Sequence, residues 1–74
     1  MANRFTAYIE RDAESGQYIS IVPGVRGAHT QASTIDKLIE QTKEVLELCL
    51  EEMDDEERDA IPFFVGVQQI EVAI

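Results

Sequence analysis

Polar and apolar residues alternate with a period of two along the first part of the chain. In residues 4–11 every second residue is apolar, which is typical of a strand with one buried face. Residues 17–22 are β-branched and apolar and predict a second strand. Residues 12–16 lie between them and have turn chemistry, because Asp and Ser bond their own backbone and glycine adopts a positive φ. The pattern predicts a β-hairpin.

A period of three and four residues replaces the alternation after Thr34. Its apolar positions are Ile35, Leu38, Ile39, Thr42, Val45, Leu46, Cys49 and Met53. The opposite positions are charged or polar, so we expect an amphipathic helix that is capped by Ser33 or Thr34. Leu48 and Leu50 flank the apolar stripe. They belong either to a broad core face or to a second surface used for self-association.

Other elements lie on either side of this helix. Pro23 ends the second strand because it cannot donate to a ladder, and residues 28–31 predict a short third strand. After Pro62, residues 63–74 are mostly apolar and predict a closing strand. The expected order is β-β-β-α-β, an α+β fold with a three-stranded antiparallel meander, one long helix and the closing strand.

Acidic residues concentrate directly after the long helix. Residues 51–60 contain seven acids and one arginine, so they hold −6 of the net charge of −9. Acids oppose the dipole at a helix C-terminus, so we predict that a short separate helix starts here, capped by Asp54 or Asp55. The block either keeps the chain in solution or faces a partner. The candidate partner interface consists of Glu51, Glu52, Asp54, Asp55, Glu56 and Glu57.

The overall charge narrows the classes of partner. Nucleic acids require clustered Lys and Arg, and the six basic residues here are scattered, so we expect no direct nucleic-acid binding. An anionic membrane is disfavoured for the same reason, and no apolar run is long enough to span a bilayer. A basic protein is the natural complement of an acidic chain.

Length and cysteine content set further bounds. Seventy-four residues form one domain, 1–74, with a modest core, and such domains often bury more surface by association. We therefore expect a homodimer or a higher oligomer. The single cysteine excludes an intrachain disulfide framework, and the N-terminus has no apolar run of signal-peptide length. Both observations favour a cytoplasmic protein.

No residue pattern predicts catalysis, and we expect no enzyme activity, cofactor or metal. The glycines near Pro23 precede a strand and lack the spacing of a phosphate-binding loop. His29 is the only histidine, and Cys49 has helix-core spacing, so neither has the companions of a metal or nucleophile site. A carboxylate-based nuclease site from Glu10, Glu40 and Glu71 has no support from spacing.

The region from the second strand through the helix resembles the HicB-like antitoxin family. The matching residues are Tyr18, Ile19, Pro23, Val25, Gly27, Thr30, Gln31, Thr34, Ile35 and Asp36. Along the helix they continue with Gln41, Lys43, Glu44, Leu46, Leu48, Leu50 and Glu51. The resemblance extends from Phe5 to about Glu52, and the terminal residues suit the closing strand of that family.

This resemblance implies a partial RNase H-like fold without nuclease carboxylates, and a loop around Pro23 that is scaffold. It also implies a function, which is to bind and block a small basic ribonuclease toxin of the HicA type. Full-length members carry a C-terminal DNA-binding domain, and we expect this chain to be a single-domain member without one. The alternatives are a self-associating relative with another protein or small-molecule partner, and a metal-dependent nuclease relic.

Overall fold

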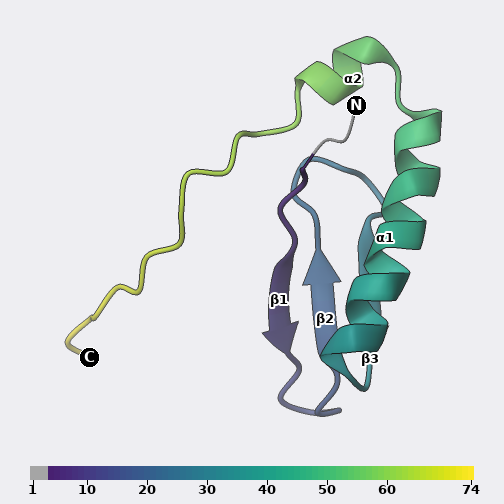
Figure 1. Cartoon of the computed structure of the whole chain (residues 1–74). Coiled ribbons are helices and arrows are strands. Elements are labelled where there is room, and N and C mark those ends of the chain that lie inside the picture. The colour runs from purple at the N-terminus through teal and green to yellow at the C-terminus, as the bar shows by residue number, and fades with distance from the viewer. Residues whose placement is uncertain (1–3) are drawn as a thin grey trace.

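The computed structural model describes residues 4–74 and has a three-stranded sheet with one long helix on one of its faces (Figure 1). Its elements are β1 (Tyr8–Arg11), β2 (Tyr18–Ile21), β3 (His29–Ala32), α1 (Ile35–Glu52) and α2 (Asp55–Asp59). The strands lie in the order β1-β2-β3 and neighbouring strands are antiparallel. The predicted meander and long helix, and with them the α+β class, are confirmed.

The hairpin of β1 and β2 forms where the alternation predicts it. Tyr8 pairs with Ile21 and Arg11 pairs with Tyr18. In the turn, the Asp12 carboxylate accepts hydrogen bonds from the backbone N–H and the hydroxyl of Ser15, at 2.9 and 2.7 Å. These two bonds lower the pKa of Asp12, the bond from the backbone N–H most. The side chain therefore closes the turn, as the sequence predicts.

The loop between β2 and β3 contributes directly to the core. The Val22 N–H donates to the Ala28 carbonyl at 3.0 Å, so the ladder extends one pair beyond the strands. Val25, in the middle of the loop, is buried with Val22 and Ala28. Gly24 has a φ of 82°, a conformation that an L side chain rarely adopts. The loop is therefore packed scaffold.

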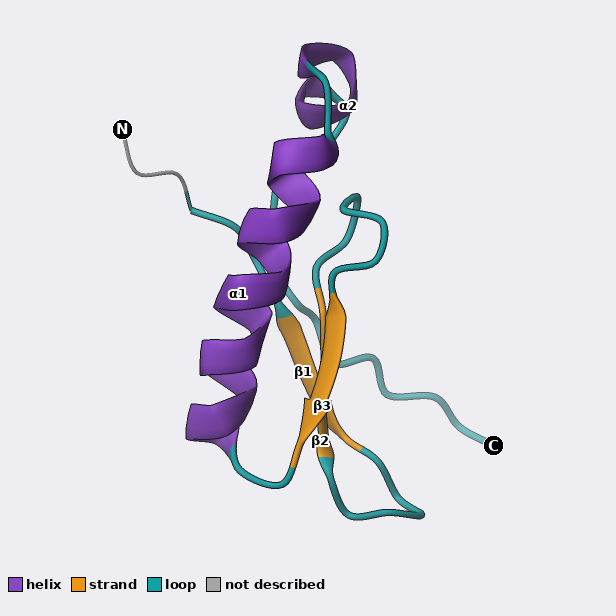
Figure 2. Ribbon diagram, turned by 90° about the vertical axis from the view of Figure 1, so that its right-hand side faces the viewer, coloured by secondary structure: helices purple, strands orange, loops and turns teal. Residues whose placement is uncertain are grey.

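Helix α1 packs over β2 and β3 and leaves the other face of the sheet open (Figure 2). Leu38 is fully buried beneath it. The hydroxyl of Thr42 donates to the Leu38 carbonyl at 2.7 Å and also lies 2.9 Å from the hydroxyl of Thr30 on β3. Ser20 on β2 is buried as well. The interface between helix and sheet therefore contains three hydroxyls among small apolar side chains.

Both helices begin at residues that the sequence singles out. The Thr34 hydroxyl accepts from the Lys37 N–H at 3.2 Å and caps α1. Asp54 caps α2 in a capping box, in which its carboxylate accepts from the Glu57 N–H at 2.8 Å and the Glu57 carboxylate accepts from the Asp54 N–H at 3.2 Å. Three of the four acids of α2, Asp55, Glu56 and Glu57, thus lie in its first turn, where the helix dipole favours them. The predicted short separate helix is confirmed.

The predicted closing strand is not formed. Residues 62–74, which we call the C-terminal arm, are extended but pair with no strand within the described residues, and they run away from the sheet (Figure 1). A strand requires a neighbouring edge as well as an apolar pattern, and the pattern alone gave no information about the neighbour. Within residues 4–74 no helix is long and apolar enough to cross a membrane.

Candidate functional site

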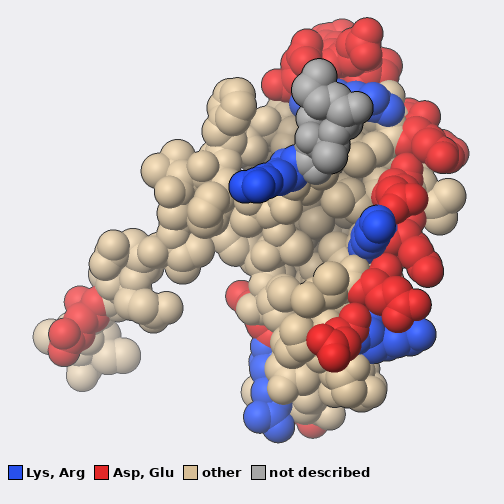
Figure 3. Space-filling model, in the orientation of Figure 1, with Lys and Arg blue, Asp and Glu red and all other residues tan. Residues whose placement is uncertain are grey.

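The acidic block covers the end of the molecule where α1 stops and α2 follows (Figure 3). All six candidate interface acids, Glu51, Glu52, Asp54, Asp55, Glu56 and Glu57, are exposed. None of them forms an ion pair with Lys or Arg within the described residues, where the one ion pair is Lys37–Glu40 at 4.0 Å. The structure therefore brings these carboxylates together on one surface, continuous with the acidic outer side of α1.

Arg58, which lies within the acidic block, bonds the backbone of α1 and forms no ion pair with these carboxylates within the described residues. The Arg58 guanidinium donates to the carbonyl oxygen of Leu50, in the last turn of α1. A cation at this position compensates the unpaired carbonyls and the negative end of the helix dipole. The sequence pattern did not reveal this role, because α2 must turn back before Arg58 can reach Leu50. The carboxylates of the acidic block are left without this partner.

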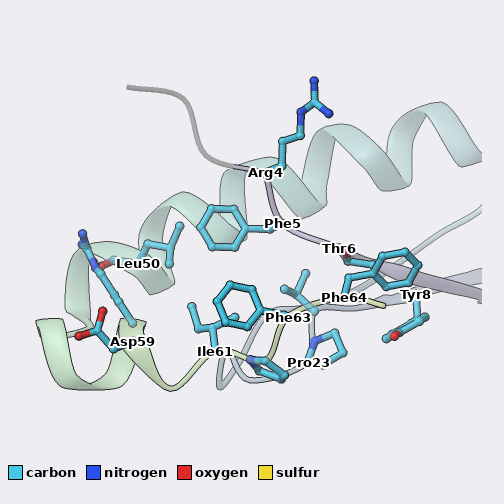
Figure 4. Close-up of a pocket in the computed structure, with 13 residues that line it drawn as sticks. Arg4, Phe5, Thr6, Tyr8, Pro23, Leu50, Asp59, Ile61, Phe63 and Phe64 are labelled. Carbon is cyan, nitrogen blue, oxygen red and sulfur yellow. The ribbon is translucent and has the colours of Figure 1, made fainter. Parts of the chain in front are cut away.

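A hollow of about 920 Å³ lies beside the acidic block. It is bounded by the segment before β1, the end of α1 and the start of the C-terminal arm (Figure 4). Phe5 and Leu50 line one side of it, and Ile61 and Pro23 line the other. Its walls are mainly apolar, and the Arg4 side chain points away from it. The sequence did not predict this hollow, since its walls come from four separate segments.

The two leucines predicted for self-association do not share a surface. Leu50 is half-buried and lines the hollow, whereas Leu48 is 64% exposed and lies near Cys49 and Arg26. Residues two positions apart on a helix are separated by about 200° around its axis, so they point in nearly opposite directions. Leu48 and Leu50 therefore lie on opposite flanks of α1, and their role in self-association stays a prediction.

The residues that could act as nucleophiles, bases or metal ligands are dispersed over the structure. His29 is exposed on β3, and Cys49 is half-buried against the core. Within residues 4–74, no three side chains of His, Cys, Asp or Glu are grouped so that they could hold a metal ion. Glu10, Glu40 and Glu71, on β1, α1 and the C-terminal arm, are therefore not brought together as a metal site.

Proteins of similar sequence match nearly the whole chain. A UPF0150 protein of Thermotoga maritima is 47% identical over 68 residues, which cover 92% of this chain and 88% of the relative. This chain belongs to the UPF0150 family. UPF0150 proteins of Synechocystis and Archaeoglobus fulgidus are 43% and 44% identical over 68 and 69 residues. No family model matches this UPF0150 protein, and neither does any solved structure.

Proposed function

We propose that this UPF0150 protein is a HicB-like antitoxin that binds and neutralises a small basic ribonuclease toxin of the HicA type. The observation that carries the proposal is the acidic block. Its six carboxylates are exposed, close together and free of ion pairs within residues 4–74. A ribonuclease must offer cations to RNA phosphates, and a dense carboxylate surface competes for the same cations.

The sequence resemblance supports the same partner independently of charge. It covers the sheet and α1, which hold the acidic block in place. On this proposal the protein acts by occlusion: it covers the basic surface of the toxin and excludes RNA. It needs no chemistry of its own for this task, and it is not an enzyme.

The proposal predicts a short reading frame for a basic protein next to the gene of this chain, and it is tested by expressing that protein. Expressed alone, that protein should arrest growth and degrade RNA, and co-expression of this UPF0150 protein should restore growth. A neighbour that is harmless, or a toxic neighbour that this chain neither binds nor inhibits, would refute the proposed function.

The acidic block is then tested by association kinetics. Asp55→Asn with Glu56→Gln removes two charges from it and leaves the capping box of α2 intact. The matched control, Glu10→Gln with Glu14→Gln, removes two exposed charges near the hairpin turn, at the opposite end of the molecule. If the toxin docks at the block, the first pair should slow association at low salt by about threefold or more relative to the control.

This difference should shrink as the ionic strength rises to about 0.15 M, where the screening length is about 8 Å. Equal association rates for the two pairs at low salt would show that the toxin docks elsewhere.

A further inference from the structure

We propose that the C-terminal arm, residues 62–74, binds a second copy of this chain, where it adds a strand along the free edge of β1. Exchanged between two copies, the arms would join them as a symmetric dimer. This inference does not depend on the proposed toxin, because it concerns a different surface and a different partner.

The composition of the arm indicates that a binding partner covers it. Its large apolar side chains are all exposed in the single chain, between 52% and 115%: Phe63, Phe64, Val65, Val67, Ile70, Val72 and Ile74. It carries one charge, Glu71, in a chain of net charge −9. Large apolar patches that are exposed to water mark interaction surfaces. Two acidic copies repel each other, so a nearly uncharged segment is the suitable contact between them.

The path of the arm shows why it does not complete its own sheet. Phe64 lies against Tyr8, with ring centroids 6.3 Å apart. Tyr8 and its strand partner Ile21 point to the open face of the sheet, since Ser20, the residue next to Ile21, is buried toward α1. The arm therefore crosses to the face opposite α1 and leaves the molecule there (Figure 2). It runs beside its own β1 only at its first residues.

The body of the protein offers an edge that suits such an arm. β1 is an edge strand in the described part of the chain, so half of its backbone groups have no strand partner there. Helix α1 covers β2 and β3, which leaves Ile9 of β1 42% exposed and Ile39 of α1 54% exposed. β1 also exposes the charged Glu10 and Arg11, but the opposite edge, β3, has α1 over one face and exposes His29 and Gln31 on the other. An apolar strand therefore fits the β1 edge better than the β3 edge.

The end of the arm has the alternation that such a strand requires. Ile70, Val72 and Ile74 share one face, and Gln69, Glu71 and Ala73 share the other. The first face can cover Ile9 and Ile39 of the partner while the second faces solvent. Burying an aliphatic side chain removes roughly 60–120 Å² from water, so the six side chains that this face provides in two arms would bury about 360–720 Å² before the surface beneath them is counted. Specific interfaces bury about 1,200–2,000 Å².

The first test is the mass in solution and its dependence on the arm. We expect light scattering to give a mass of twice 8.3 kDa for the full chain at micromolar concentration. Ile70→Asp with Val72→Asp should raise the dimer dissociation constant by at least about tenfold, because it places charges in the contact. The matched control, Gln69→Asp with Ala73→Asp, adds the same charge to the other face and should have a much smaller effect.

The second test identifies the edge and the exchange. One sample of the chain has no ¹⁵N and carries a spin label at Gln69→Cys in a Cys49→Ala background. It is mixed with ¹⁵N-labelled chain that carries no spin label. Exchange onto β1 predicts broadening of the amide signals of Tyr8–Arg11 in the ¹⁵N chain, more than those of His29–Ala32. A monomer, a dimer that both arm variants leave unchanged, or broadening mainly at β3 would overturn the proposal. None of these outcomes bears on toxin binding.

Discussion

Ser20→Ala should stabilise this protein, although it removes a hydroxyl from the centre of the fold. Ser20 lies in the middle of β2 and is 1% exposed. Its Oγ has no hydrogen-bond partner within the described residues. Its neighbour across the strand pair, Thr30, bonds Thr42, and the Thr42 proton is donated to the Leu38 carbonyl. The Thr30 proton therefore goes to Thr42, and the Ser20 hydroxyl remains outside this chain of bonds.

The size of the effect follows from the cost of that burial. A buried hydroxyl without a partner costs about 1–3 kcal/mol. Alanine removes this cost and leaves only the volume of one oxygen atom empty, while its lower strand propensity takes back a few tenths of a kcal/mol. We expect a net gain of about 1 kcal/mol. For a domain of this size, that gain raises the melting temperature by about 4–8 °C.

The assay is thermal unfolding followed by circular dichroism at one fixed protein concentration, because association shifts apparent stability. The control is Thr42→Val, which also deletes a buried hydroxyl but leaves the hydroxyl of Thr30 without its partner. Thr42→Val should lower the melting temperature. If Ser20→Ala lowers it too, with unchanged mass in solution, then the Ser20 hydroxyl is satisfied and our reasoning about its burial is wrong.

Three further predictions concern the core, the turn and the loop. Leu38→Ala should cost about 2–5 kcal/mol in urea denaturation because Leu38 is fully buried, whereas Leu48→Ala, at an exposed position, should cost much less. The hydrogen bonds from Ser15 lower the pKa of Asp12 below 3.8, so NMR should show its carboxyl titrating lower. The stabilisation of the fold by these hydrogen bonds should be present above pH 3.8 and lost as the pH falls through the lowered pKa. Asp12→Asn should remove this pH dependence of the stability. Gly24→Ala should cost at least about 1 kcal/mol in the same denaturation assay, because φ there is 82°.

The elements that the sequence predicted correctly have signals within a few neighbouring residues. The hairpin follows from alternation and from the turn at Asp12, and α1 follows from its apolar stripe and the cap at Thr34. The start of α2 follows from the conflict between a run of acids and a helix C-terminus, which the capping box of Asp54 resolves. In each case the deciding interaction links residues close together along the chain, so the pattern contains it.

The features that the sequence did not predict depend on distant segments. The missing closing strand is one, since an apolar segment does not specify which edge it pairs with. The hollow beside Phe5 is another, and so is the Arg58 bond to Leu50. The acidic block could be predicted as a charged surface, but its lack of ion pairs within residues 4–74 follows only from the positions of the basic residues.

The proposed toxin binding and the proposed self-association should be separable, because the two proposed surfaces differ in character. The acidic block lies on α2 and the end of α1, whereas the C-terminal arm is apolar with one charge, and the two charges of β1, Glu10 and Arg11, cancel. The arm variant Ile70→Asp with Val72→Asp should therefore no longer dimerise. Its association rate constant for the toxin, counted per binding site, should be unchanged. Asp55→Asn with Glu56→Gln should slow the toxin but leave the dimer intact, or tighten it, because two less acidic copies repel each other less. If the arm variant also slowed toxin association as much as the loss of the acidic charges does, the two surfaces would form one composite site. The toxin would then contact both copies of the dimer.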